Sequence, residues 1–275
     1  MLPNQKEAPI AVIKKDKVLA LFSSILRRLT DLVYGRPSCC ALCGSLLPRT
    51  GGKWSSRSRE RELRAASQTP GICDSCLDRL ALQMAWVCEI CGGPIKPPLR
   101  VCPDCQKCFY TFDGQRSAGI YDSDLKNAVI RMKFQGERWL SRPLGWLVAK
   151  AARDFLPVDL VIPIPIDPGS RIRRGYNQAM DLAKEVSALL DVPLVDVLSR
   201  DKRYSHQAEL GRNKRWGNLK ESMGAKRTVN LKGKRCLLID DVTTTGATLD
   251  EAARVLKHLG AEKVFCATVA RTLRH

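Results

Sequence analysis

Cysteine pairs with the spacing of zinc ligands dominate the first half of the chain. Four Cys-x-x-Cys pairs occur, and they are Cys40/Cys43, Cys73/Cys76, Cys88/Cys91 and Cys102/Cys105. Two intervening residues allow both thiolates of one tight turn to face the same ion, and zinc takes four such ligands in a tetrahedron. The eight cysteines therefore predict two four-cysteine zinc sites. Because four thiolates leave no coordination position open, both sites are predicted to be structural.

The residue after each pair indicates how the pairs combine. Gly44 follows the first pair and Gly92 the third, as the tight turn of a zinc knuckle requires, whereas the second and fourth pairs lack a glycine. We therefore join neighbouring pairs, with nested pairing as the alternative. Redox-active dithiols are the competing interpretation, but they need a thioredoxin-like strand–helix context that is missing here. Cys39 and Cys108 remain outside both predicted sites.

A phosphate-binding loop is the second chemical signal, in the segment CLLIDDVTTTGAT from Cys236 to Thr248. An apolar strand ends in two adjacent acids, and a hydroxyl-rich loop then opens a helix. Backbone N–H groups and hydroxyls in such a loop bind phosphate, and the helix dipole favours the negative charge. The predicted phosphate ligands are Thr243, Thr244, Thr245, Gly246, Ala247 and Thr248.

Asp240 and Asp241 lie one step before that loop, where they can hold a neighbouring diol directly or through Mg²⁺. A phosphate next to a diol describes a ribose 5-phosphate. Other phosphate fingerprints, G-x-x-x-x-G-K-[ST] and G-x-G-x-x-G after a strand, are absent. The alternative is an ordinary strand–turn–helix with solvated acids.

A proline-rich strand end followed by arginines is the third signal. Pro165 precedes Arg171, Arg173 and Arg174, and three arginines within four positions suit a dense anion such as pyrophosphate. The alternative is a basic surface turn.

Together these segments resemble a known family. The phosphate loop is similar to the phosphoribosyl-diphosphate motif of type I phosphoribosyltransferases. VIPIPIDPGSRIRRGYNQA, from Val161 to Ala179, resembles the signature of the ComF family, whose competence-related members also carry N-terminal cysteine pairs. The resemblance covers residues 18–275, although residues 49–70 form a longer insertion than is usual there. The matching residues are Pro163, Pro165, Arg171, Arg173, Arg174, Gly175, Tyr176, Asn177 and Gln178, with further matches at Tyr121, Lys133, Phe134, Gly136, Gln207, Arg215 and Asn218.

The resemblance implies both a fold and a set of roles. The fold is a type I phosphoribosyltransferase-like α/β domain, with a parallel sheet and helices on both faces, preceded by a double zinc ribbon. Phosphoribosyl diphosphate would bind with Mg²⁺. Asp240 and Asp241 would hold the sugar, and Arg173 and Arg174 would hold the leaving pyrophosphate. Arg215 falls in a basic segment similar to the loop that closes over the substrate in such enzymes, with a solvated linker as the alternative.

The elements that must position these residues alternate along the chain. Helices are predicted over residues 124–134, 139–153, 177–190 and 247–259, and strands over 158–164, 192–197, 235–239 and 264–270. Apolar strands alternating with helices predict a parallel sheet covered on both faces. Cys236 and Cys266 lie in these strands and are predicted core residues. An amphipathic helix over residues 16–34 is predicted to pack on the protein, with a membrane surface as the alternative.

Three parts follow from this pattern. Residues 1–37 form a tail and helix, residues 38–110 a double zinc ribbon with a basic insertion at 49–70, and residues 111–275 the phosphoribosyltransferase-like domain. No apolar run reaches the roughly 18 residues that span a bilayer, so no membrane span is predicted. Because the N-terminus lacks a signal peptide, we expect a cytoplasmic protein, in which clustered cysteines indicate metal binding rather than disulfides.

The net charge of +18 leaves two functions to be weighed. Such an excess indicates polyanionic partners, with a solvated basic surface as the alternative, and much of it lies between Asp196 and Arg235. The first hypothesis is an enzyme that transfers phosphoribosyl to an unidentified acceptor and releases pyrophosphate. The second is a non-catalytic protein of DNA uptake or DNA metabolism. It would bind single-stranded DNA, act with a DNA-uptake helicase, and keep the phosphate site as a sensor or relic.

Overall fold

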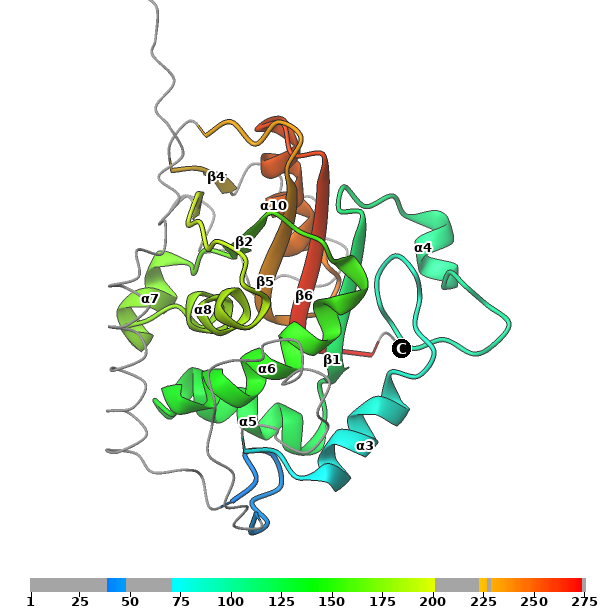
Figure 1. Ribbon diagram of the computed structural model, residues 1–275, viewed down its shortest axis with the longest axis vertical. Coiled ribbons are helices and arrows are strands. Elements are labelled where there is room, and N and C mark those ends of the chain that lie inside the picture. Colours follow the sequence, from blue (N-terminus) through cyan, green and yellow to red (C-terminus); the bar gives the residue numbers. More distant parts are fainter. Residues whose placement is uncertain (1–38, 48–70, 201–222, 227–228, 274–275) are drawn as a thin grey trace, which may run out of the picture.

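The computed structural model describes residues 39–47, 71–200, 223–226 and 229–273 (Figure 1). The helix predicted over residues 16–34, the insertion at 49–70 and Arg215 lie outside the described residues. Within the described ranges, no helix is both long and apolar enough to cross a membrane.

Four parallel strands form the central sheet, in the order β1-β6-β5-β2 (Figure 1). They are β1 (Gly114–Ile120), β2 (Leu160–Pro163), β5 (Arg235–Thr243) and β6 (Lys263–Arg271). The strands predicted over residues 158–164, 235–239 and 264–270 are thereby confirmed in position. β5 continues four residues beyond residue 239, so the strand contains Asp240 and Asp241, which were predicted at its end, and also includes Thr243 of the predicted phosphate loop.

Side chains alternate between the two faces of the sheet with the period of two that a strand imposes. On β5, Leu237 and Ile239 pack into one hydrophobic cluster, whereas Cys236 and Leu238 pack into the other. Cys236 and Cys266 are fully buried, which confirms that both are core residues. The sheet is therefore buried on both sides, as an all-parallel sheet with crossover helices requires.

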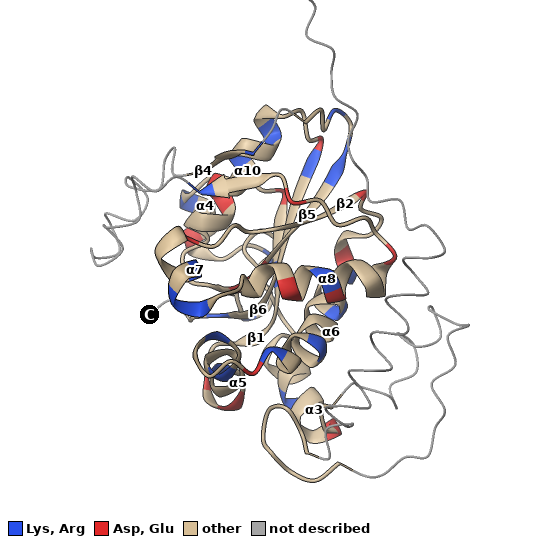
Figure 2. Cartoon of the chain, turned by 90° about the vertical axis from the view of Figure 1, so that its left-hand side faces the viewer, with Lys and Arg blue, Asp and Glu red and all other residues tan. Residues whose placement is uncertain are grey.

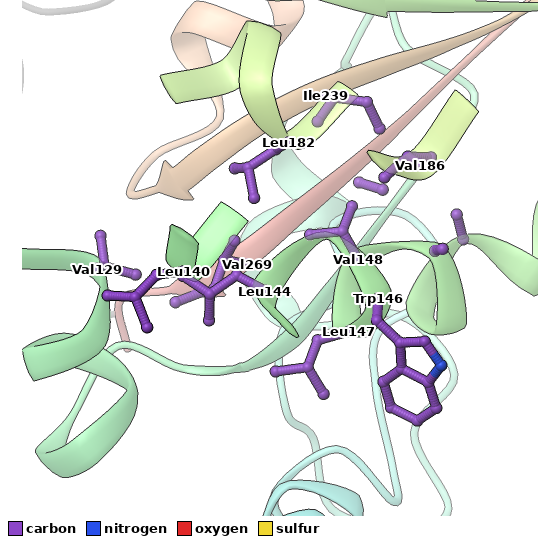
Figure 3. Close-up of a cluster of buried hydrophobic side chains, with 14 of the residues drawn as sticks. Val129, Leu140, Leu144, Trp146, Leu147, Val148, Leu182, Val186, Ile239 and Val269 are labelled. Atoms are coloured by element: carbon purple, nitrogen blue, oxygen red, sulfur yellow. The ribbon is translucent and has the colours of Figure 1, made fainter. Parts of the chain in front are cut away.

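Helices cover both faces. The cluster containing Leu237 includes buried residues of α5 (Ser123–Phe134), α6 (Ser141–Ala151) and α8 (Gln178–Leu190), and Figure 3 shows part of it. α10 (Ala247–His258) packs into the opposite cluster. Gly145 lets α6 approach α8 closely, since a Cβ at this position would lie 2.6 Å from the Cβ of Glu185. The predicted α/β fold with helices on both faces is confirmed.

Three connections differ from the sequence-based expectation. Residues 139–153 divide into η1 (Arg138–Leu140), α6 and η2 (Ala152–Phe155) instead of one helix. No strand spans residues 192–197, where Leu194 forms a single bridge to Val161, and the next paired strands are β3 (Leu198–Arg200) and β4 (Met223–Ala225). The arginine-rich segment after β2 is a helix, α7 (Pro168–Arg174), whose basic positions are coloured blue on the ribbon in Figure 2.

The cysteine-containing segments lie along β1, the edge strand of the sheet (Figure 1). They contain α3 (Asp74–Gln83) and α4 (Pro103–Lys107). The backbone N–H of Gln115 on β1 donates to the carbonyl of Ile90 at 2.8 Å, and Leu80 of α3 packs so close to Gly119 that a Cβ there would clash at 2.5 Å. These segments thereby cover an edge whose backbone groups would otherwise be open to pairing.

Candidate functional site

The acid pair lies at the carboxyl end of β5, beside a lysine from α5. Lys133 Nζ is 2.9 Å from Asp241 Oδ1, and both side chains are largely buried, at 18% and 11% exposure. Asp240 Oδ1 accepts from the backbone N–H of Asp241 at 2.8 Å, and Asp241 Oδ1 accepts from that of Val242 at 2.6 Å. Two adjacent carboxylates are thus held by one cation and two backbone amides.

Burial, followed by the charge of Asp241, raises the pKa of Asp240 to about 7, and Lys133 opposes this shift. Removing a carboxylate from water penalises its charged form, and a second carboxylate nearby adds repulsion. A group with such a pKa changes its charge near neutral pH. Perturbed acids of this kind concentrate at functional sites, which marks this end of β5 as a candidate.

The predicted phosphate loop leads from β5 directly into α10. Gly246, at φ +85°, is the N-cap of α10, and the left-handed backbone it adopts is one that glycine tolerates without strain. Thr245 Oγ1 accepts from the backbone N–H of Ala247 at 3.3 Å, while Thr243 is buried and Thr244 is exposed. The 12-residue helix that follows directs its first N–H groups and the positive end of its dipole towards the loop. This geometry suits an anion.

The opposite wall is the segment that follows β2. Asp167 caps α7 by accepting from Gly169 and Ser170 N–H at 3.0 and 2.9 Å. Asn177 caps α8 and also donates from Nδ2 to the carbonyl of Ile164 at 3.0 Å. The two caps hold the chain around Pro165 against the end of the sheet.

An open pocket of about 180 Å³ lies between α5, the segment after β2 and the acid pair, and Thr248 is the one residue of the predicted phosphate loop in its lining. Of the predicted site residues it contains Asp240, Asp241, Thr248, Pro165 and Arg174. Its full lining is Lys133, Ile164, Pro165, Ile166, Asp167, Ser170, Arg174, Asn177, Gln178, Arg200, Asp240, Asp241 and Thr248.

Arg171 and Arg173 are exposed and lie outside this lining, because on a helix successive side chains point about 100° apart. Arg173 donates instead to Ser170 Oγ at 3.0 Å. The three arginines therefore do not converge on one point, and the pyrophosphate role of Arg171 and Arg173 stays a prediction.

Lys133, Gln178 and Arg200 line the pocket although the sequence analysis assigned them no role. Lys133 and Gln178 lie in the stretches that resemble the ComF family, and this resemblance could have indicated a role for them. No sequence feature indicated a role for Arg200. Gln178 is only 3% exposed, and its Nε2 is buried without a hydrogen-bond partner in the described part of the chain, as is Nε of Arg174. Buried donors normally have partners, so both atoms suit a ligand that carries acceptor oxygens.

The eight paired cysteines form two separate clusters, Cys40/Cys43/Cys73/Cys76 and Cys88/Cys91/Cys102/Cys105, with the sulfurs of each within 4.8 Å of one another. The prediction that neighbouring pairs combine is confirmed. Four thiolates around zinc at 2.3 Å place their sulfurs about 3.8 Å apart. The Cys43–Cys73 and Cys91–Cys102 sulfur distances of 3.7 and 3.8 Å match this value, so the residues fit two tetrahedral zinc sites. Among the described residues, Cys39 and Cys108 belong to neither cluster.

The two clusters are built alike. In each, the N–H of the glycine after a pair donates to the carbonyl of the first cysteine at 2.9 Å, in Gly44 to Cys40 and Gly92 to Cys88. In each cluster, the second cysteine pair lies at the start of a helix. The backbone N–H of its first cysteine donates to the sulfur of the cluster's first cysteine, from Cys73 to Cys40 at 3.4 Å and from Cys102 to Cys88 at 3.3 Å. The two clusters therefore repeat a whole structural unit, a glycine-containing turn followed by a helix, and not only the cysteine pairs that are visible in the sequence. The insertion at 49–70 therefore leaves the geometry of the first cluster unchanged.

The second cluster contacts the phosphate loop. Tyr110, just after this cluster, donates from its hydroxyl to the carbonyl of Thr245 at 3.1 Å, and its ring lies 3.3 Å from the position of a Cβ on Gly246. Arg271, at the end of β6, donates to the carbonyl of Cys91. The conformation of the loop is thus stabilised from the side of the second cysteine cluster.

The first cluster contacts α5, the helix that carries Lys133. Arg131 of α5 donates to the carbonyl of Ala41 at 3.2 Å. Arg79 donates both to Asp124 of α5, at 2.7 Å, and to the sulfur of Cys76, at 3.4 Å. The first cluster therefore supports α5, which lines the pocket through Lys133, and the second supports the loop that leads to Thr248.

Comparisons with known proteins agree with this architecture. The parallel sheet, the acid pair and the threonine-rich loop before α10 define a type I phosphoribosyltransferase-like protein, and the family model "Phosphoribosyl transferase domain" matches residues 173–274. Competence protein F of Haemophilus influenzae is 32% identical, over 73% of this chain and 90% of the relative. Competence protein ComFC of Bacillus subtilis is 26% identical, over 85% and 95%. DNA utilization protein YhgH of Salmonella typhi is 27% identical, over 74% and 98%. The chain belongs to the ComF family.

Two zinc ions per chain are expected from elemental analysis of protein purified without chelator. Cys88→Ser should lower the content to about one and unfold the second unit, because structural zinc contributes on the order of 10 kcal/mol to the folding of such units. Cys108→Ser is the matched control, since this exposed cysteine lies outside both clusters, and it should retain two ions. A metal-free wild-type protein would refute the assignment, as would loss of zinc from the control.

Proposed function

We propose that the pocket binds phosphoribosyl diphosphate together with Mg²⁺ and that the protein transfers the phosphoribosyl group to an acceptor, with release of pyrophosphate. The observation that carries the proposal is the meeting of three features in one pocket. The acid pair lines the pocket, Thr248 lines it from the end of the phosphate loop, and Pro165 and Arg174 line it from the segment after β2. Membership of the ComF family and the matched phosphoribosyl transferase domain support it.

Each side of the pocket suits one part of the ligand. The N–H groups and hydroxyls between Thr243 and Thr248 would bind the 5-phosphate. Asp240 and Asp241 would accept hydrogen bonds from the ribose hydroxyls. Arg174, Lys133 and Arg200 would face the pyrophosphate, whose several negative charges match a cationic wall.

The reaction breaks the bond between the anomeric carbon and pyrophosphate and forms a bond from that carbon to the acceptor. Positive charge develops on the sugar as the leaving group departs, and two carboxylates fixed beside it would stabilise that charge. The arginine and lysine would stabilise the departing pyrophosphate. Carboxylate oxygens are the donors Mg²⁺ prefers, and the ion would neutralise the pyrophosphate and order the sugar hydroxyls around it.

Replacing both acids should abolish Mg²⁺-dependent binding. Calorimetry on Asp240→Asn with Asp241→Asn should show a loss of affinity for phosphoribosyl diphosphate of at least ~100-fold, as expected when hydrogen bonds to charged groups worth about 1.5–3 kcal/mol each are removed. Zinc content should not change. The charge-matched control is Asp154→Asn with Glu262→Gln, two exposed acids outside the pocket. Equal affinity in the two double variants would show that the acid pair does not bind this ligand.

Affinity for Mg²⁺ and phosphoribosyl diphosphate should rise with pH through about 7. The pKa of Asp240 is raised to about 7, so below this pH the side chain is increasingly protonated and must lose its proton before it can hold a cation. The affinity should fall by up to ~10-fold per pH unit below 7 and level off above it. The ligand's own phosphate titration is common to wild type and Asp240→Asn, so the difference between their pH profiles isolates this group. Parallel profiles would contradict the assignment.

A second candidate function is a non-catalytic role in DNA uptake or DNA metabolism, in which the phosphate site acts as a sensor or relic. Relatives named Competence protein F and DNA utilization protein favour it, as does the net charge of +18. In this role the protein would bind single-stranded DNA and act with a DNA-uptake helicase.

DNA binding in this role should be weakly sequence-specific and strongly dependent on salt. Neutralising DNA phosphates releases counterions, so the logarithm of the affinity should fall linearly with that of the salt concentration. A filter-binding titration across salt, with and without saturating phosphoribosyl diphosphate, measures this and shows whether the ligands share a surface. Absence of DNA retention at low salt would remove the second candidate.

A further inference from the structure

Tyr110 lies between the second cysteine cluster and the phosphate loop. Its side chain packs against the buried cysteines of that cluster and also against the core cluster that contains Leu249 of α10. The ring stacks on Phe112, which is 3% exposed, with ring centres 4.6 Å apart and an interplanar angle of 25°. Thr111, between the two aromatic residues, donates its backbone N–H to Asp250 of α10 at 2.5 Å. Tyr110 is therefore positioned both by the cysteine cluster and by the core that α10 joins.

The start of the phosphate loop is fixed by the sheet, whereas its later residues are not. Thr243 pairs with Arg271 of β6, and its carbonyl accepts from the backbone N–H of Thr272 at 3.0 Å. Thr245 and Gly246 lie beyond this pairing, between the end of β5 and the first turn of α10. The contact from Tyr110 is made in this part of the loop.

The hydroxyl of Tyr110 sets the orientation of one peptide in the loop. It donates to the carbonyl of Thr245 at 3.1 Å, and the peptide between Thr245 and Gly246 is trans. Because C=O and N–H point in opposite directions across a trans peptide, this hydrogen bond turns the N–H of Gly246 away from Tyr110. A reversed peptide would turn the partial negative charge of a carbonyl to that side instead, where it would repel an anion.

Gly246 makes this constraint necessary. Its φ of +85° is accessible to glycine, but glycine adopts other conformations as readily, so the backbone alone does not hold the loop in one shape. The rings of Tyr110 and Phe112 lie 3.3 and 3.7 Å from the position of a Cβ on Gly246. Since these rings fill one side of the glycine, an anion has to approach from the side away from them.

We propose that Tyr110 is a positioning residue for the bound phosphate. It holds the peptide between Thr245 and Gly246 in the orientation that binds an anion, so that the affinity of the loop depends on the folded second cysteine cluster. The inference rests on the proposed function, because it takes the 5-phosphate of a phosphoribosyl group as the ligand of this loop. Without the hydroxyl, only a fraction of the molecules holds the competent loop, and the apparent affinity falls by that fraction.

The first test is calorimetry on the full chain with two probes, ribose 5-phosphate and pyrophosphate with Mg²⁺. Tyr110→Phe removes one hydroxyl and keeps the ring, and it should weaken the binding of ribose 5-phosphate about three- to ten-fold, the effect of one lost hydrogen bond. The affinity for pyrophosphate, which the proposed function assigns to the wall with Arg174, should stay within about two-fold. Phe109→Ala is the matched control, a neighbouring aromatic that is 97% exposed, and it should bind both probes as the wild type does.

The outcomes of this test separate the inference from the function on which it rests. If Tyr110→Phe binds ribose 5-phosphate as tightly as the wild type, the hydroxyl does not position the loop and the inference is overturned, while the proposed function stands. An equal loss of affinity for both probes also overturns it, because Tyr110 would then support the pocket as a whole. If the wild type binds neither ribose 5-phosphate nor phosphoribosyl diphosphate, the proposed function itself is refuted.

A second test measures the same coupling from the metal side. Metal binding folds units of this kind, and if the folded unit raises the affinity for a ligand, linkage requires the ligand to raise the affinity for that metal by the same factor. Competition with a chelator should show one of the two zinc ions bound about ten-fold more tightly in saturating ribose 5-phosphate. Tyr110→Ala should still bind two ions but lose most of this increase. Equal zinc affinity of the wild type with and without the ligand would overturn the dependence on the second cluster.

Discussion

Repulsion between Asp240 and Asp241 is the constraint on which the pocket depends. Adjacent carboxylates at the end of a strand, largely withdrawn from water, are stable only if other groups supply compensating charge and hydrogen bonds. Lys133 supplies the charge from α5, and the backbone of β5 supplies two N–H donors. Burial, and after it the charge of Asp241, outweighs this compensation, which is why the pKa of Asp240 remains high. The acid pair can therefore accept further interactions from a cation or from ligand hydroxyls. The site also depends on the position of α5, because its last turn carries Lys133.

The two cysteine clusters act on this site through the elements that they support. The first cluster holds α5 by way of Arg131 and Arg79, and the second holds the loop after β5 by way of Tyr110. The same segments cover the exposed edge of β1, where an unpaired strand would invite association with other chains. Residues around the first cluster, such as Ala41 and Leu42, belong to the hydrophobic cluster that also contains α6 and α8. We therefore propose that the boundary expected near residue 110 separates chemical roles rather than independently packed bodies.

The parts of the site that the sequence predicts are those whose chemistry is local. Zinc ligands within one turn, and an acid pair followed by a glycine-containing threonine loop, are short patterns that seldom serve any other chemistry. Lys133 and Gln178 were not assigned roles because their importance comes from tertiary neighbours that no spacing reveals. The arginines of α7 were expected to act together, but the segment is a helix, and helical geometry separates them.

Parts of the fold were missed for related reasons. β1 was not predicted because its segment is not apolar. Ser117 within it is buried, yet it is satisfied by a 2.7 Å hydrogen bond to Thr268 of β6, a compensation that is visible only once the strands are paired. The strand expected over residues 192–197 is apolar enough to pair, but it forms only the bridge from Leu194 to Val161.

The two four-cysteine units share one geometry although their connecting segments differ greatly in length. The thiolates Cys43 and Cys73 are 30 positions apart in the chain, whereas Cys91 and Cys102 are 11 apart. The entropic cost of closing a chain segment grows only with the logarithm of its length, so the longer connection costs about 0.9 kcal/mol more. That penalty is small beside the free energy of a four-thiolate site. The metal-binding geometry is therefore nearly independent of what joins its two halves, and the first unit is a place where the chain can gain or lose sequence over evolutionary time without disturbing the pocket.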